Sequence, residues 1–220
     1  MALRFVLSHG WGFSPAFWAP LLEKWPFTQP PIVWDAGYYG LPDLSLPAAD
    51  ASTQWVGIGH SIGFARLIRQ NRSFSALIGL QAFTRFLGDN PPLREQRLAE
   101  WEQLSMHFDA SAVATLKSFY RRCGVPGKWF APEQCNRAAL KTDLQQLKES
   151  LSLPDSVPVL ILSSQDDVIV PPAILQDNFQ GTSSTIDYCD TARHALGYLE
   201  PEWVLERIQT FLKEHHALPG

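Results

Sequence analysis

The sequence lacks several features that would place it in particular classes of protein. No apolar run approaches the ~20 residues that cross a bilayer, so we expect no membrane association. Only three of the 220 residues are cysteine, an odd number without metal-ligand spacing, so we expect no disulfide framework and no metal. Residues 1–12 lack the charged start and cleavage site of a signal peptide. These absences favour a reducing, cytoplasmic setting.

Charged residues are also scarce, at 18%, and the net charge is −4, which argues against nucleic-acid binding. The glycine-rich strings that bind dinucleotides or nucleotide phosphates are missing, so no cofactor is implied. What the chain has instead is material for a core: 45% hydrophobic residues, including 13 Phe and 8 Trp. Its length predicts one domain, and we expect a monomer.

Short apolar stretches alternate with amphipathic segments, a pattern typical of an α/β fold with a mainly parallel sheet covered by helices. Strands are predicted at residues 3–8, 32–34, 54–59, 76–80, 158–162 and 185–188. Helices are predicted at residues 15–25, 62–72 and 201–215. The first of these helices begins with Ser14 as its N-cap.

The stretch from residue 85 to residue 153 contains no convincing strand. Its pattern predicts three helices, at 92–107, 110–122 and 132–151, with Asp109 capping the second and Pro126-Gly127 breaking the chain after it. We therefore predict that residues 1–84 and 154–220 form the core. Residues 85–153 are expected to form a helical lid inserted between core strands.

The segment Gly59-His60-Ser61-Ile62-Gly63 stands between a predicted strand and a predicted helix. This is the G-x-S-x-G pattern of a nucleophile elbow, a turn so sharp that side chains two residues either side of the serine would collide. The serine hydroxyl is left exposed, and the following helix N-terminus favours developing negative charge. An ordinary glycine-rich turn is the competing interpretation, and the strand–turn–helix context argues against it.

A nucleophilic serine needs a base, and the base needs an orienting acid. His194 lies in a short loop between the last predicted strand and the last predicted helix, where the base is expected after Ser61 and the acid. The other histidines after Ser61 are assigned to helix ends: His107, His215 and His216. Asp166 and Asp167 both follow the fifth strand, and the D-x-x-V-P string favours Asp167.

The oxyanion of the reaction needs two N–H donors. One is expected from the backbone of Ile62, directly after the serine. The other is expected from the loop His9-Gly10-Trp11-Gly12, with the N–H of Trp11 the best placed. His9 is expected to brace this loop by hydrogen bonds.

Taken in order along the chain, these motifs resemble those of the α/β-hydrolase family. More narrowly, the sequence resembles the pimeloyl-[acyl-carrier protein] methyl ester carboxylesterases of biotin synthesis. The narrower resemblance rests on the His-Gly-Trp-Gly loop and on a helix around Phe119 followed by Arg137-Ala138-Ala139-Leu140-Lys141. The chain departs from that family in a shortened N-terminus, without the usual first hairpin, and in Phe64, where a second glycine is common.

The resemblance implies a serine carboxylesterase that hydrolyses the methyl ester of pimeloyl-acyl-carrier protein through an acyl-enzyme. It assigns Ser61 as nucleophile, His194 as base and Asp167 as orienting acid, with Trp11 and Ile62 as oxyanion donors. Phe119 and Tyr120 would line the acyl channel, with core packing as their alternative role. An acidic carrier protein would bind basic residues of the lid: Lys117, Arg121, Arg122, Arg137 and Lys141.

The charge distribution supports an acidic partner independently of the resemblance. Residues 117–141 hold six basic residues and one acidic residue, in a chain with 18 basic and 22 acidic residues. A solvated helix face is the alternative interpretation. Other functions stay open: a general short-chain carboxylesterase, an acyl thioesterase, a lyase or carbon–carbon bond hydrolase with the same triad, and a non-catalytic ligand-binding module.

Overall fold

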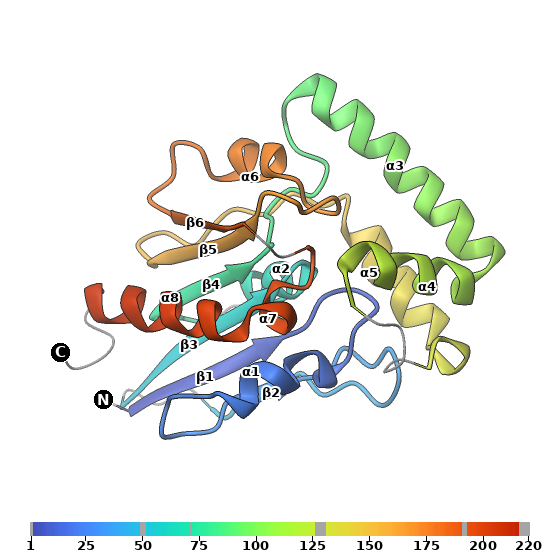
Figure 1. Ribbon diagram of the computed structural model, residues 1–220. Helices are drawn as coiled ribbons and strands as arrows, with labels where there is room; N and C mark the ends of the chain where they lie inside the picture. The colour runs from blue at the N-terminus through green and yellow to red at the C-terminus, as the bar shows by residue number, and fades with distance from the viewer. Residues whose placement is uncertain (1, 49–51, 71, 126–130, 191–192, 216–220) are drawn as a thin grey trace.

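The computed structural model describes residues 2–48, 52–70, 72–125, 131–190 and 193–215. Its centre is a six-stranded sheet with the strand order β2-β1-β3-β4-β5-β6, in which all neighbouring strands are parallel (Figure 1). The strands are β1 (Ala2–Ser8), β2 (Ile32–Trp34), β3 (Thr53–His60), β4 (Ala76–Leu80), β5 (Val159–Ser164) and β6 (Thr185–Cys189). All six predicted strands are therefore present.

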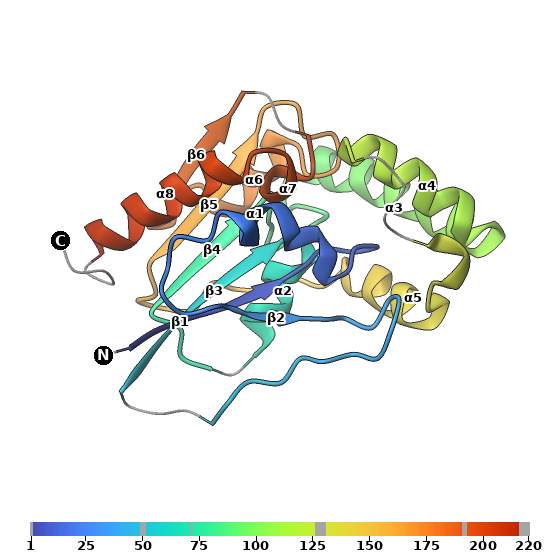
Figure 2. The ribbon, with the colours of Figure 1, turned by 60° about the horizontal axis from the view of Figure 1, so that its bottom comes forward.

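Helices cover both faces of the sheet, as the apolar strands require. Every residue of β4 and β5 is buried. The short helices η1 (Pro15–Trp18), α1 (Ala19–Glu23) and α7 (Leu196–Leu199) pack with α8 (Pro201–Glu214) on one face, and α2 (Ile62–Arg69) packs against β1, β3 and β4 on the other (Figures 1 and 2). The predicted fold class is confirmed.

Residues 85–153, called the helical insertion below, lie beyond the carboxyl ends of the strands (Figure 1). They form α3 (Pro91–Ala110), α4 (Ala112–Cys123), η2 (Pro132–Gln134) and α5 (Arg137–Gln146). The two ends of the insertion meet, because Arg85 forms a β-bridge with Ser150 and the Leu151 N–H donates to the Thr84 carbonyl at 3.0 Å.

Several predicted helix boundaries were wrong. Asp109 does not cap the second insertion helix, because α3 continues through Ala110 and the hydroxyl of Ser111 accepts from the Ala114 N–H instead. The third insertion helix begins at residue 137, where Asn136 caps it, and ends at residue 146. The helix after the elbow ends at residue 69. The predicted break at Pro126-Gly127 lies outside the described residues.

Two helices were not predicted, α6 (Pro172–Phe179) and the short α7. Pro172 occupies the first helical position of α6, which is a favoured place for proline and was the signal available in the sequence. None of the helices within the described part of the chain is long and apolar enough to cross a membrane. The three cysteines, all of them described, are not joined by a disulfide.

Candidate active site

The turn around Ser61 has the strained geometry of a nucleophile elbow. Ser61 has φ 54° and ψ −127°, a backbone conformation that is uncommon for a residue with a side chain. The flanking glycines avoid contacts with the backbone. A Cβ on Gly59 would lie 2.3 Å from the Cα of Phe64, and one on Gly63 would lie 2.0 Å from the Ser8 carbonyl oxygen of β1. The predicted collision therefore exists, but β1 as well as the turn itself causes it.

Asp167 and His194 meet at the carboxyl end of the sheet. Nδ1 of His194 lies 2.8 Å from Oδ2 of Asp167, and both side chains are completely buried. The other carboxylate oxygen of Asp167 accepts from the N–H groups of Ile169 and Val170 at 2.8 and 3.0 Å, which fixes its orientation. Asp166 is exposed, and no hydrogen bond or ion pair is found between it and His194.

His194 Nε2 is buried and has no hydrogen-bond partner within the described residues. The ring of His60, which directly precedes Ser61, lies 4.9 Å from the His194 ring. The base candidate is therefore close to the elbow, with its accepting nitrogen available. Its orientation toward Asp167 leaves that nitrogen as the one that can receive a proton.

The loop His9–Gly12 lies against the elbow, since a Cβ on Gly10 would be 3.1 Å from the Cβ of Ser61. Among the described residues, the backbone N–H groups of Trp11 and Ile62 donate to no acceptor. His9 holds the loop as predicted: Nδ1 contacts the Gly10 carbonyl at 3.0 Å, and Nε2 accepts from the Ala36 N–H at 3.2 Å. Burial lowers the pKa of His9, so the ring is neutral at pH 7.

Trp11 joins this loop to the helical insertion. Its indole Nε1–H donates to the Leu140 carbonyl of α5 at 2.8 Å, and its ring packs edge-on against Phe108 of α3 and Phe119 of α4. Tyr120 also reaches the loop, donating from its hydroxyl to the Gly12 carbonyl at 2.6 Å. The insertion thus contacts the loop that carries one of the free N–H groups.

A buried arginine forms a second connection to α5 that was not predicted. Arg66 of α2 donates to the Ser8 hydroxyl at 2.8 Å, to the His9 carbonyl at 2.9 Å and to the Asp143 carboxylate at 2.7 Å. The Tyr38 hydroxyl also donates to Asp143. One guanidinium therefore connects α2, β1, the His9–Gly12 loop and α5.

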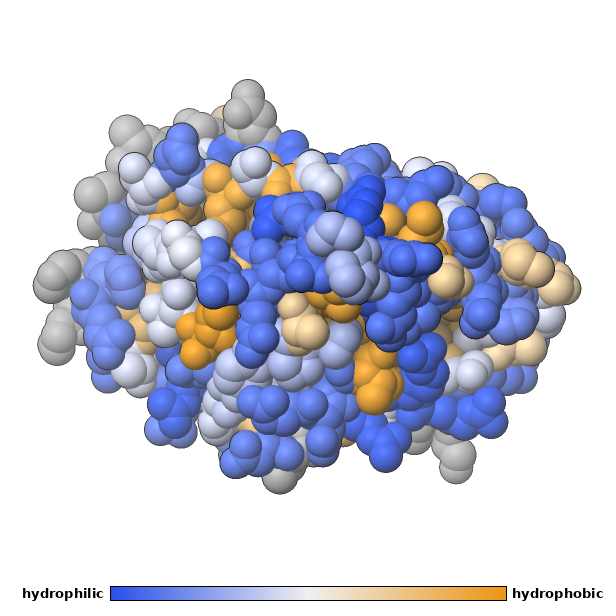
Figure 3. Space-filling view, turned by 90° about the horizontal axis from the view of Figure 1, so that it is seen from above, coloured by the Kyte–Doolittle hydropathy of each residue, from blue (hydrophilic) through white to orange (hydrophobic). Residues whose placement is uncertain are grey.

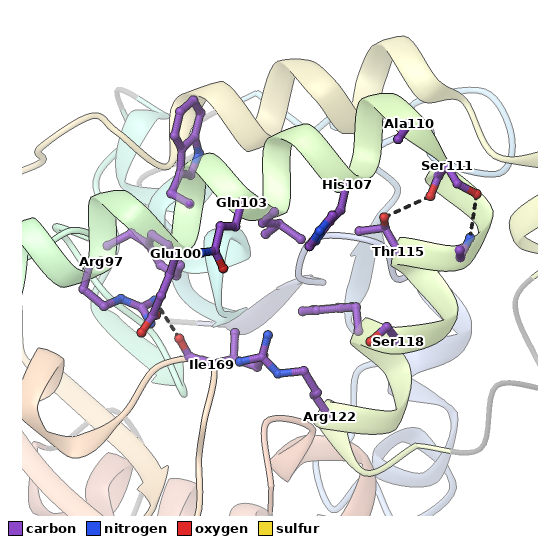
Figure 4. A pocket seen from close by; sticks show the side chains of 15 residues that line it. Arg97, Glu100, Gln103, His107, Ala110, Ser111, Thr115, Ser118, Arg122 and Ile169 are labelled. Atoms are coloured by element: carbon purple, nitrogen blue, oxygen red, sulfur yellow. Dashed lines mark hydrogen bonds and ion pairs between the residues drawn. The ribbon is translucent and has the colours of Figure 1, made fainter.

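A cavity of about 590 Å³ lies between α3 and α4, next to the loop that follows Asp167. Figure 4 shows Gln103 and His107 of α3 directed into the cavity, and Arg122 of α4 extended toward Ile169. Phe119 lines the cavity and also packs against the His194 ring, with centroids 6.3 Å apart. Tyr120 is not among the lining residues. Phe119 therefore stands between the cavity and the base candidate. Ser61 itself is only 6% exposed.

The five basic residues predicted to bind a carrier protein fall into two groups. Lys117 and Lys141 form ion pairs with Glu133 and Asp109, both at 2.7 Å, and Arg137 donates to the Asp109 carbonyl at 3.1 Å. Arg121 and Arg122 line a second hollow, of about 690 Å³, that is also lined by Asp166 and Asp167.

Arg193, which the sequence reasoning missed, lines the same hollow. These three residues, called the arginine cluster below, form no ion pair within the described part of the chain. The face of the molecule seen in Figure 3 is largely hydrophilic, with apolar side chains exposed in small separate patches.

No family model matches the chain, and a comparison with curated proteins finds no match. Solved structures do resemble it over nearly its whole length. An esterase from Exiguobacterium antarcticum has a TM-score of 0.75 at 14% identity, covering 97% of this chain and 92% of that chain. A thermophilic esterase from Thermogutta terrifontis has a TM-score of 0.69 at 18% identity, with coverage of 98% and 91%.

A bromoperoxidase from Bacillus anthracis is similar to the same extent, with a TM-score of 0.70 at 15% identity and coverage of 97% and 92%. These likenesses establish the α/β-hydrolase fold of the chain. The reaction has to be argued from the site itself, because one fold supports many activities.

Proposed function

We propose that the protein is a serine hydrolase that cleaves carboxylic esters. The observation that carries this proposal is the buried Asp167–His194 pair, whose second imidazole nitrogen is unpaired beside an elbow serine. In this mechanism, His194 Nε2 takes the proton of Ser61 as its hydroxyl attacks the ester carbonyl. The N–H groups of Trp11 and Ile62 stabilise the oxyanion, and Asp167 stabilises the imidazolium.

The imidazolium then gives its proton to the leaving alcohol, and the acyl group stays on Ser61 as an ester. His194 next deprotonates a water molecule, which attacks the acyl-enzyme. Collapse of the second tetrahedral intermediate releases the carboxylic acid and returns the proton to Ser61. One ester and one water thus become one acid and one alcohol, without a cofactor.

The substrate we propose is the methyl ester of an acyl group carried by an acidic acyl carrier protein, with pimeloyl as the acyl group that the sequence resemblance favours. Two features of the site support a carrier-bound acyl ester. The cavity beside Phe119 is large enough to take an acyl chain. The arginine cluster beside the Asp167 loop forms no ion pair among the described residues, and it would attract an acidic partner toward the site.

The first test concerns the nucleophile. Ser61→Ala should abolish ester turnover and labelling by a serine-directed fluorophosphonate while leaving the thermal unfolding temperature close to that of wild type. Ser73→Ala, at an exposed position away from the site, is the matched control and should behave as wild type. Turnover by Ser61→Ala near the wild-type rate would overturn the assignment.

The second test identifies the bond that is cleaved. Mass spectrometry of the methyl ester of pimeloyl-acyl-carrier protein after incubation with the enzyme should show loss of one methyl group from a carrier that keeps its acyl chain. Release of the whole acyl group would instead identify a thioesterase. No change, with short free esters still hydrolysed, would leave a general carboxylesterase.

A further inference from the structure

We propose that Gln81 is a positioning residue for this reaction: its side-chain amide fixes the backbone on both sides of His194 and so keeps the imidazole against Asp167. The inference rests on the proposed function. Gln81 directly follows β4, and its side chain is completely buried. No motif in the sequence singles it out.

The amide of Gln81 uses both of its ends on the loop that carries the base. Its Nε2 donates to the Arg193 carbonyl, and its Oε1 accepts from the Leu196 N–H at 2.8 Å. These two backbone groups lie on either side of His194 in the chain. Fixing both of them limits the loop to one conformation, because neither end can shift without leaving a buried polar group unpaired.

The backbone of Gln81 is bound to the strand that leads to the acid. Its N–H donates to the Leu162 carbonyl of β5 at 2.7 Å, and β5 ends three residues before Asp167. One residue therefore contacts both the strand that leads to the acid and the loop that carries the base. His60 adds to this arrangement, because its Nε2 lies 2.8 Å from the His194 carbonyl.

The backbone conformation of Gln81 supports a role for its side chain. Its φ is 51°, in the left-handed region that glycine adopts without strain. A glutamine at such a position is uncommon, and the backbone strain is offset here by the two hydrogen bonds that its amide group makes. A side chain that merely filled space would not need a donor and an acceptor aimed at two different backbone groups.

The test compares three variants in the full-length protein, with an ester that the wild type hydrolyses. Gln81→Met keeps the volume of the side chain and removes both hydrogen bonds. We expect kcat to fall by on the order of 10- to 100-fold, with KM within about twofold of wild type, because a small misplacement of a catalytic group has effects of this size. Gln176→Met, on the exposed face of α6, is the matched control and should keep the wild-type kcat.

Gln81→Glu supplies a readout that loss of stability alone would not give. A protonated carboxylic acid can donate to the Arg193 carbonyl and accept from the Leu196 N–H, as the amide does, whereas the carboxylate cannot donate. Burial raises the pKa of a carboxyl group, so the competent form is populated as pH falls toward 5. The ratio of Gln81→Glu to wild-type kcat should therefore rise as pH falls, while the ratio for Gln81→Met stays flat.

A spectroscopic measurement separates failure of this inference from failure of the proposed function. The low-field proton resonance of the His194 Nδ1–H···Asp167 hydrogen bond can be followed by NMR without any substrate. It should be lost or broadened in Gln81→Met at temperatures well below unfolding. Wild-type kcat in Gln81→Met, a flat pH ratio in Gln81→Glu, or an unchanged resonance would each overturn the role of Gln81, whatever the substrate proves to be.

Discussion

The helical insertion is attached to the catalytic end of the sheet at two places of different character. At α5 the attachment is buried: Asp143 binds Arg66, and Leu140 accepts from the Trp11 indole. Around the cavity, hydrogen bonds to backbone carbonyls attach α3 and α4 to the loop after Asp167. The buried Arg97 donates to the Ile169 carbonyl at 2.8 Å, and the exposed Arg122 donates to the Val168 carbonyl at 3.3 Å.

The two attachments suggest different roles for the two parts of the insertion, one in catalysis and one in substrate binding. The α5 side is bound to the loop that we propose supplies an oxyanion donor, as is Tyr120 of α4, so these hydrogen bonds should affect the hydrolysis of any substrate. The α3–α4 side surrounds the cavity and carries two residues of the arginine cluster, so its residues affect which substrate is bound.

The largest effect should come from breaking the buried attachment. Asp143→Ala leaves the Arg66 guanidinium buried without its counter-charge, and we expect it to lower the free energy of unfolding by about 3–5 kcal/mol, measured by urea denaturation. The matched control is Glu133→Ala, which removes the exposed partner of Lys117 and should leave the unfolding midpoint close to that of wild type. Equal effects of the two variants would show that the Arg66–Asp143 pair contributes no more to stability than an exposed ion pair.

A smaller effect on the free energy of unfolding should follow from lowering the pH, because buried histidines lie on the sheet side of the site. Burial lowers the pKa of His9 and lowers that of His60 further, so neither ring is readily protonated in the folded state. The unfolded chain binds protons at these positions below about pH 6.5, so the free energy of unfolding should decrease as pH falls, by up to about 1.4 kcal/mol per pH unit for each ring.

The contribution of His60 can be isolated with His60→Gln, which keeps an N–H for the His194 carbonyl and removes the titration. Its free energy of unfolding should depend less steeply on pH between 6.5 and 5 than that of wild type. An unchanged slope would show that His60 does not contribute to the pH dependence.

The smallest effect on stability, and the most selective effect on function, should come from the arginine cluster. Arg122→Gln combined with Arg193→Gln should reduce kcat/KM for a carrier-bound ester several-fold at low salt, with little change for a short free ester. Lys117→Gln combined with Lys141→Gln is the matched control, because both lysines already have carboxylate partners. A larger loss in the lysine variant would place the carrier on the other face of the insertion.

The strands and the geometry of the Ser61, Asp167 and His194 segments follow from local patterns in the sequence. The elbow requires glycines at fixed offsets, and the acid and base follow strands in a set order, so spacing alone indicates them. Gln81, Arg66 and Asp143 could not be identified in this way. Each acts through partners 57 to 115 positions away in the chain, and only the folded arrangement brings those partners together.

The basic residues of the insertion also show what a sequence pattern cannot predict, namely which of them form ion pairs in the folded protein. A count of charges in residues 117–141 indicates a basic surface, but it cannot tell that Glu133 and Asp109 neutralise one part of it. Nor can it include Arg193, which lies some 70 residues later in the chain and joins the cluster only through folding.

The indole of Trp11 has a practical consequence for protein engineering. Because α5 shares a hydrogen bond with the His9–Gly12 loop, replacing the whole insertion would disturb the catalytic machinery, whereas exchanging residues 91–123 alone would leave that bond in place. The exchanged helices would need to keep Trp101, which donates to the Leu144 carbonyl of α5, and Tyr120, which donates to Gly12. If both residues are kept, α3 and α4 can be exchanged to change substrate preference while the proposed catalytic residues stay the same.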